Sequence, residues 1–95
     1  MKVDVRIFGP LRLNSGKKGL TLELAGPKVR LREILKEVAK VKGLEELEGV
    51  AKRGFGDGAP FIILVDGRNC LDLKGLDTEV SEGQKVSIFP PSAGG

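Results

Sequence analysis

The reactive chemistry that this sequence offers lies at its carboxyl end. The final seven residues are FPPSAGG, so that Gly94 and Gly95 follow the pair Pro90-Pro91. A terminal carboxylate is a poor electrophile, but its oxygen can attack the α-phosphate of ATP and form an acyl adenylate, which carries a good leaving group. A covalent intermediate of this kind divides one difficult step into two easier ones, because sulfur or an amine then displaces the adenylate.

The residues before the terminus are suited to reaching into another protein. Glycine has no Cβ and wide conformational freedom, so Gly94 and Gly95 form a thin end. Pro90 and Pro91 favour an extended polyproline conformation, which directs that end away from the domain. Residues 90–95, extended at about 3.3 to 3.6 Å each, span roughly 20 Å. The tail therefore predicts delivery of its carboxylate into the active site of a partner.

The rest of the sequence shows no side chain equipped for catalysis. It contains no histidine, which removes the usual base for a serine or cysteine nucleophile and the commonest metal ligand. Cys70 is the single cysteine and cannot build a zinc site alone, so we expect it to be a buried structural thiol. The run from Gly54 to Gly58 lacks the strand, the helix and the Gly-Lys-Ser ending of a phosphate loop. We therefore predict no catalytic residue, no metal and no resident cofactor.

Composition indicates one small soluble domain. The chain has 95 residues, of which 40% are hydrophobic and 31% charged, with a net charge of +3. No apolar run is long enough to cross a membrane, and the alternating residues 1–5 lack the apolar block of a signal peptide. The basic residues are scattered and Tyr and Trp are absent, which argues against a nucleic-acid partner. A single cysteine agrees with a reducing compartment, and we expect a cytoplasmic protein.

Hydrophobic periodicity predicts the elements that carry the tail. Strict alternation of apolar and polar residues predicts strands over residues 2–8, 20–24 and 85–89, and a continuous apolar run predicts a fourth strand over 61–65. Apolar residues at helical spacing predict one main helix over 31–41, ended by Gly43. Gly9-Pro10 breaks the first strand, and the stretch after it, which contains Asn14, Ser15 and Gly16, is interpreted as irregular. The other less regular parts are interpreted as a short helical turn at 44–48, a loop over 49–60, an edge strand over 70–73 and a connection over 76–82.

This order of elements predicts an α+β fold, with a mixed sheet of four to five strands and one main helix packed on one face. A hairpin followed by a right-handed crossover lets the last strand lie beside the first. The arrangement is that of the β-grasp, the fold of ubiquitin. We assign residues 1–89 to this domain and residues 90–95 to a flexible Gly-Gly tail.

Four apolar side chains are predicted to form a docking surface. Phe8 and Phe89 belong to the polar-patterned faces of the first and last strands. The strand over 61–65 is apolar on both faces and adds Ile62 and Leu64 near them. Small monomers rarely expose such a patch without a partner. We therefore predict that these residues bind another protein on the sheet face away from the helix.

A β-grasp order that ends on a strand, Phe89-Pro90-Pro91 and Gly94-Gly95 resembles the MoaD/ThiS family of ubiquitin-like sulfur carriers. The tail is most similar to the branch that forms the small subunit of molybdopterin synthase. The resemblance implies that an E1-like adenylating enzyme of the MoeB type activates the terminal glycine, and that a persulfide sulfur donor converts it to a thiocarboxylate. The charged carrier then docks with a synthase large subunit of the MoaE type and delivers sulfur to a cyclic pyranopterin. The product is the dithiolene that holds molybdenum or tungsten.

The resemblance also assigns roles to the tail residues. Gly95 is the residue that is adenylated and carries the thiocarboxylate, and Gly94 is the spacer that lets it pass. The remaining spacer residues are Ala93, Ser92, Pro91 and Pro90. ATP is bound by the partner, so the resemblance implies no cofactor on this chain. The loop over 49–60 departs from a minimal carrier, and this leaves open which large subunit or activating enzyme the chain fits.

Three alternatives use the same fold. In the first, a ubiquitin-like protein modifier of the archaeal type, the activated Gly95 is joined to a target lysine through an isopeptide bond. In the second, the sulfur serves tRNA thiolation, thiazole synthesis or cysteine synthesis, although the Phe-Pro-Pro tail argues mildly against the thiazole branch. In the third, the chain is a non-covalent β-grasp adaptor whose tail is dispensable. The first two begin with the same adenylate as the main hypothesis, so the sequence does not separate them from it.

Overall fold

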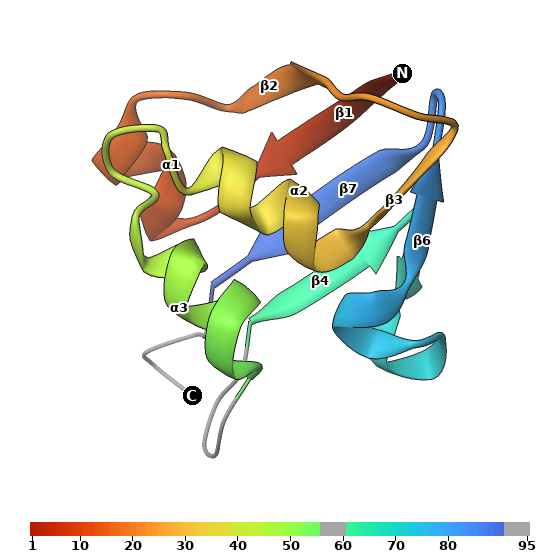
Figure 1. Ribbon diagram of the computed structural model, residues 1–95. Helices are drawn as coiled ribbons and strands as arrows, with labels where there is room; N and C mark the ends of the chain where they lie inside the picture. Colours follow the sequence, from red (N-terminus) through yellow and green to blue (C-terminus); the bar gives the residue numbers. More distant parts are fainter. Residues whose placement is uncertain (56–60, 91–95) are drawn as a thin grey trace.

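The computed structural model describes residues 1–55 and 61–90, and Figure 1 shows their arrangement. The main strands are β1 (Lys2–Ile7), β2 (Gly19–Glu23), β4 (Ile62–Val65), β5 (Arg68–Asn69) and β7 (Lys85–Phe89). They form one mixed sheet in the order β2-β1-β7-β4-β5. Two helices, α2 (Leu31–Val38) and α3 (Glu46–Arg53), lie across one face of this sheet. The predicted fold class, a β-grasp sheet covered on one face, is confirmed.

The parallel pair of β1 and β7 forms the centre of the sheet. Val5 lies opposite Val86 and Ile7 lies opposite Ile88, while β2 and β4 flank this pair in antiparallel orientation. Alternate residues of a strand point to the same face, and Val3, Val5 and Ile7 are all fully buried. The predicted adjacency of the first and last strands is therefore confirmed.

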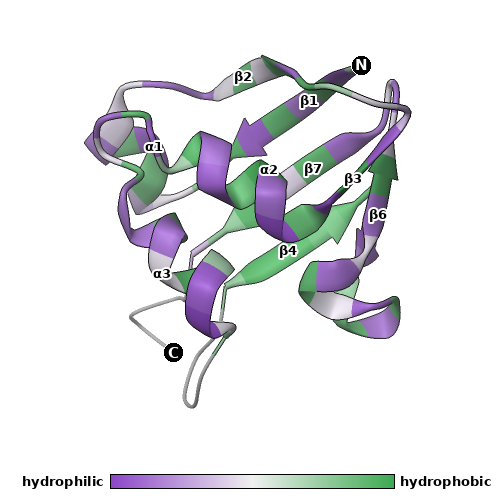
Figure 2. Ribbon diagram, viewed as in Figure 1, coloured by the Kyte–Doolittle hydropathy of each residue, from purple (hydrophilic) through white to green (hydrophobic). Residues whose placement is uncertain are grey.

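The core lies between this sheet and α2. The apolar stripe of α2 is fully buried and consists of Leu31, Ile34, Leu35 and Val38. Figure 2 shows hydrophilic residues on the outward side of α2 and hydrophobic residues along β4. Burying one side chain of this size contributes roughly 1.5 to 3 kcal/mol. The stripe therefore holds the helix against the inner face and leaves the outer face of the sheet to other contacts.

The helix predicted over 31–41 ends earlier, at Val38. The chain continues through a tight turn, in which Lys40 N donates to Glu37 O and Val41 N donates to Val38 O. These short-range bonds satisfy helix-end carbonyls that have no partner further along the helix. Gly43 follows with a φ of 96°, and the backbone of residues 14–15 leaves no room for a side chain there. Gly43 therefore lies beyond the end of the helix, and the prediction that Gly43 ends the helix is wrong, because the tight turn after Val38 ends it earlier.

The prediction of a loop over 49–60 is wrong in its first part, because residues 49–53 belong to α3, which continues to Arg53. Leu47, Val50 and Ala51 are buried on α3, and Arg32 of α2 donates from Nη1 to the carbonyl of Ala51 at 2.9 Å. Gly49 within this helix lowers helical propensity, and the tertiary contacts override it. Residues 56–60 of the predicted loop lie outside the described residues.

An exposed ion pair adds to the surface of α3. Lys52 Nζ lies 3.0 Å from Glu48 Oε1, one helical turn away. The Lys52 ammonium, by its hydrogen bond and then by its charge, lowers the pKa of the Glu48 carboxyl. Pairs of this spacing stabilise a helix only weakly, so burial of the apolar residues accounts for most of the stability of α3.

A short helix, α1 (Pro10–Ser15), occupies a stretch that was predicted to be irregular. Pro10 stands at the start of the helix, where its missing N–H costs nothing. Leu11 is fully buried, and Ser15 Oγ donates to Leu11 O at 2.8 Å. A helix of six residues is too short to show a clear hydrophobic period, which is why the sequence pattern did not indicate it.

The region after β5 also differs from the prediction. Residues 70–73 do not form an edge strand; the edge is β5, and Cys70–Asp72 form a 3-10 turn capped by Asn69 Oδ1, which accepts from Leu71 N. A second turn covers Gly75–Asp77. The predicted connection over 76–82 contains β6 (Glu79–Ser81), which pairs with β3 (Lys28–Arg30) in a separate two-stranded sheet. Strands of three residues give no alternation that a sequence pattern could detect.

Cys70 lies in the core with none of its surface exposed, as predicted. Burial raises the pKa of its thiol, so at a given pH a smaller fraction of the thiol is the reactive thiolate. We expect Cys70 to be unreactive toward Ellman's reagent in the folded protein and to react fully in guanidinium chloride. Rapid reaction of the native protein would contradict a structural role and make Cys70 a candidate sulfur or acyl acceptor.

Candidate docking surface at the base of the tail

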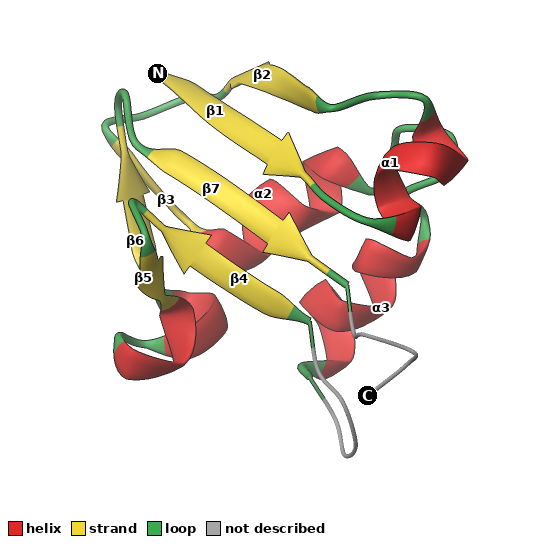
Figure 3. Cartoon of the chain, turned by 180° about the vertical axis from the view of Figure 1, so that it is seen from behind, coloured by secondary structure: helices red, strands yellow, loops and turns green. Residues whose placement is uncertain are grey.

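The outer face of the sheet is open at β1, β7 and β4. Figure 3 shows this face in front and α2 and α3 behind it. Because side chains alternate along each strand, the residues between the buried ones point outward from these strands. No helix of the described chain lies over them in this view.

The four apolar residues predicted from the sequence come together at one end of this face. The rings of Phe8 and Phe89 are stacked, with centroids 4.3 Å apart and planes 10° from parallel. Ile62 lies opposite Phe89 across the β4–β7 pair and is 48% exposed. Leu64, which is half-buried, lies opposite Ser87 two pairs further along, on the same face. The predicted proximity of these side chains is confirmed, and their binding role is a prediction.

The other end of the same face is polar. Asp4 lies opposite Lys85 across the β1–β7 pair, and Asp4 also forms an exposed ion pair with Arg6 at 3.2 Å. Thr21 of β2 continues this polar row. The apolar side chains are therefore gathered where β7 ends, next to the first residue of the tail. We refer to Phe8, Phe89, Ile62 and Leu64 as the outer patch.

Two residues that the sequence analysis missed complete this end of the molecule. The guanidinium of Arg12 lies over the Phe8 ring, with Cζ 5.2 Å from the centroid, a geometry that favours cation–π attraction. Gly9 packs against Pro90, since a Cβ built on Gly9 would lie 3.2 Å from Pro90 Cγ. The Gly9-Pro10 pair was interpreted only as a strand break. Because α1 is too short for a periodic signal, the sequence pattern did not indicate that Arg12 returns to Phe8.

The tail itself begins at Pro90, which is half-buried and is the last described residue. The predicted site residues Pro91, Ser92, Ala93, Gly94 and Gly95 lie outside the described residues. Their roles as spacer and as the reactive terminus are therefore predictions. What the structure places is the point from which the tail departs, which is the end of the central strand β7, beside the outer patch.

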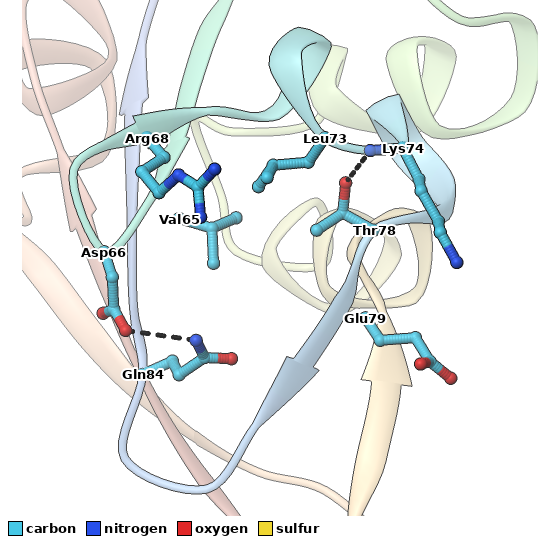
Figure 4. Close-up of a pocket in the computed structure, with 8 residues that line it drawn as sticks. All are labelled: Val65, Asp66, Arg68, Leu73, Lys74, Thr78, Glu79 and Gln84. Atoms are coloured by element: carbon cyan, nitrogen blue, oxygen red, sulfur yellow. Dashed lines mark hydrogen bonds between the residues drawn. The ribbon is translucent and has the colours of Figure 1, made fainter.

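A pocket of about 550 Å³ lies at the opposite end of β7, between the β4–β5 hairpin and the turn before β7. Figure 4 shows Asp66 and Gln84 joined by a hydrogen bond at its rim. Asp66 also accepts from Lys85 N at 2.8 Å, and the Thr78 hydroxyl donates to Gly75 O at 2.7 Å. These polar groups stabilise the turns that carry them, and the pocket lies at the end of β7 away from Pro90.

Two further findings concern residues 1–55 and 61–90. Within these ranges no helix is both long enough and apolar enough to span a membrane. Nor do three or more histidine, cysteine or acidic side chains gather there as a possible metal site.

Comparison with known proteins agrees with this geometry. The model of the ThiS family matches residues 5–95. A candidate sulfur carrier protein of Archaeoglobus fulgidus is 38% identical, and small archaeal modifier protein 3 of Haloferax volcanii is 30% identical; each alignment covers all of both chains. Among solved structures, a candidate subunit 1 of molybdopterin converting factor from Pyrococcus furiosus is 28% identical over 96% of this chain and 98% of its own, with a TM-score of 0.67.

These matches bear on the chain as a whole, because the family model and both relatives extend through the tail as well as the sheet. The structural similarity covers the same sheet and helices that place the outer patch. The chain therefore belongs to the ThiS family, and its fold is the β-grasp of ubiquitin-like sulfur carriers.

Proposed function

We propose that this protein is a sulfur carrier in which the carboxylate of Gly95 is adenylated and converted to a thiocarboxylate. One observation supports this above the others: Pro90, the first residue of the tail, follows the end of the central strand, directly beside a half-buried pair of stacked aromatic rings. A partner that binds the outer patch is then next to the root of the tail. The tail of roughly 20 Å reaches from there into that partner's active site.

The chemistry requires groups that the partners supply. A Gly95 carboxylate oxygen attacks the α-phosphorus of ATP, and pyrophosphate leaves. The terminal sulfur of a persulfide donor then attacks the acyl carbon and displaces AMP, which forms the C–S bond. A thiol reductant cleaves the resulting acyl disulfide and releases the thiocarboxylate. This chain contributes the terminus and the docking surface, while an E1-like enzyme of the MoeB type binds ATP.

For the sulfur acceptor, we propose a cyclic pyranopterin bound by a synthase large subunit of the MoaE type. The similarity to a candidate molybdopterin converting factor subunit of Pyrococcus furiosus supports this choice, as does the resemblance of the tail to that branch. The protein then acts as the small subunit of molybdopterin synthase. Its outer patch binds the large subunit while the thiocarboxylate enters the pterin site.

The test is an intact-mass measurement. The protein is incubated with ATP, its activating enzyme and a persulfide donor, and we expect a mass gain equal to the replacement of one oxygen by sulfur at the C-terminus. The product, mixed with the large subunit and the pterin precursor, should form molybdopterin. A protein that is adenylated but transfers sulfur only to a tRNA or to an amino-acid precursor would contradict the pterin assignment and keep the carrier role.

A protein modifier is the second candidate, and one finding favours it: the 30% identity with small archaeal modifier protein 3 of Haloferax volcanii. In this case a lysine amine displaces AMP and forms an isopeptide bond to Gly95. Mass spectrometry of tryptic peptides from cells distinguishes the two fates. Gly95 found only on target lysines, with no thiocarboxylate, would establish the modifier and overturn the carrier.

The width of the tail gives a separate prediction. Gly94→Ala adds a methyl group and restricts φ at the residue expected to lie in a narrow channel, whereas Ser92→Ala hardly changes the width of the chain. We expect Gly94→Ala to slow ATP–pyrophosphate exchange by the activating enzyme far more than Ser92→Ala does. Equal rates for the two variants would show that channel width does not select glycine.

A further inference from the structure

We propose that Gly9 and Arg12 are positioning residues, which hold Pro90 in a fixed place and so set the direction in which the tail leaves the domain. This inference rests on the proposed function, because the direction of the tail matters only if the tail enters a partner. It concerns residues of the β1–α1 junction, far from the tail in sequence and in contact with its root.

Gly9 forms the surface on which Pro90 rests. A Cβ added to Gly9 would lie 3.2 Å from Pro90 Cγ and 3.5 Å from Pro90 Cδ, so the proline ring packs directly on the glycine backbone. Gly9 has φ 63° and ψ −144°, a conformation that is essentially restricted to glycine. Glycine is therefore required here both for the turn and for the close approach of Pro90.

Arg12 holds this turn in place. Arg12 N donates to Gly9 O at 2.9 Å, and Arg12 Nε donates to Ile7 O at 3.0 Å, so one residue binds the carbonyls on both sides of Phe8. Its guanidinium also covers the Phe8 ring. Arg12 is half-buried, and all three of its contacts hold the segment that packs against Pro90.

The stacked rings connect this segment to the end of β7. Phe8 N donates to Ile88 O at 3.1 Å, and the Phe8 ring stacks on Phe89. Pro90 follows Phe89 directly. The residue before Pro90 and the surface beneath it are thus fixed by the same set of contacts. Pro90, the last described residue, is therefore held in one orientation.

A fixed departure lowers the cost of docking. A tail that is already directed loses less conformational freedom when it enters a channel. This is a gain in binding that is shared by the ground state and the transition state, so its loss raises KM and leaves kcat unchanged. That separation distinguishes positioning from a loss of chemistry.

The experiment compares Gly9→Ala with Gly54→Ala. Gly54 has φ 81° and ψ −169°, in the same glycine-restricted region, but a Cβ added there meets no described atom within 4 Å. The two variants therefore carry similar backbone strain, and only Gly9→Ala displaces Pro90. With the activating enzyme and ATP, we expect Gly9→Ala to raise the KM for the carrier about three- to tenfold, with kcat unchanged. Gly54→Ala should keep the wild-type KM.

A second pair covers the case in which Gly9→Ala does not fold by circular dichroism. Arg12→Gln removes the contacts to Ile7 and Phe8, and Arg6→Gln removes the same charge from the outer face without touching Pro90. We expect a raised KM only for Arg12→Gln. In the free protein, a nuclear Overhauser effect between Gly9 Hα and Pro90 Hγ should be present in the wild type and in Arg6→Gln, and lost in Arg12→Gln.

The outcomes separate the two levels of the proposal. If every variant becomes thiocarboxylated and Gly9→Ala and Arg12→Gln keep the wild-type KM, the positioning role is overturned and the carrier function stands. If the Overhauser effect persists in Arg12→Gln while its KM rises, Arg12 contacts the enzyme directly and the positioning role is again overturned. If the wild-type protein is never adenylated, the proposed function falls first, and the inference falls with it.

Discussion

Deletion of Gly95 is expected to reduce the rate of adenylation at least about 100-fold, although the shortened chain still ends in glycine. The deletion moves the carboxylate back by one extended residue, about 3.3 to 3.6 Å. A misplacement of only about 1 Å in a reacting group costs on the order of 100-fold in rate. Pyrophosphate exchange measures the effect, and intact mass should show no gain of sulfur.

A second deletion separates the effect of tail length from the effect of which residues stand at the terminus. Deletion of Ser92 keeps the final Gly-Gly and shortens the tail by the same one residue. We expect the same loss of adenylation, because reach fails in both chains. Both should melt at the wild-type temperature, since the deletions lie beyond the sheet. Wild-type activity after deletion of Gly95 would rule out a terminal-glycine carrier and favour a non-covalent adaptor.

The double variant Phe8→Glu/Phe89→Ser is expected to abolish measurable binding to the large subunit. It removes the stacked pair and places a carboxylate in an apolar interface, where a charge without a partner is costly. Aromatic residues at the centre of an interface each contribute about 2 kcal/mol or more when truncated, so the affinity should fall by at least about 30-fold for each ring. Titration calorimetry with the thiocarboxylated carrier measures the effect.

Leu71→Glu provides the matched control for this variant. Leu71 is an exposed apolar side chain, 57% accessible, on the 3-10 turn that follows β5 and outside the outer patch. Its replacement should leave the affinity unchanged. A stacked pair adds roughly 0.5 to 1.5 kcal/mol to stability beyond its buried area, so the melting temperature of the double variant should be checked before binding. Unchanged affinity in a folded double variant would show that docking uses another face.

The outer patch could be predicted from the sequence because it depends on long-range regularities. Alternation over residues 2–8 and 85–89 fixed which face each phenylalanine occupies, and the crossover rule placed the two strands side by side. The observed stack of Phe8 on Phe89 follows from these two facts. The apolar run over 61–65 predicted that Ile62 and Leu64 lie near these rings, and the structure adds the register, in which Ile62 lies opposite Phe89.

The contacts around the root of the tail could not be predicted because they depend on short-range geometry. Arg12 reaches Phe8 only because Gly9 takes a conformation restricted to glycine and α1 then turns the chain back. A six-residue helix carries too few positions for a periodic signal. The same limit applies to β6, whose three residues pair with β3 through contacts between distant parts of the chain. Gly49 led to the opposite error, because it favoured a loop where the structure has a helix. Burial of Leu47 and Ala51 on α3 overrides the low helical propensity of Gly49.

The position of β7 has a consequence for synthesis of the protein. β7 is the last strand along the described chain, yet it lies at the centre of the sheet, between β1 and β4. A nascent chain without residues 85–89 leaves β1 and β4 each without one of their two neighbouring strands, and it lacks the buried side chains Val86 and Ile88. Pairings between the two ends of a chain are slow to form, because the loop between them must first be closed. A prematurely released chain therefore lacks part of its core, Phe89 of the outer patch and the terminal glycines, and under the proposed function we expect it not to compete with full-length carriers for the activating enzyme.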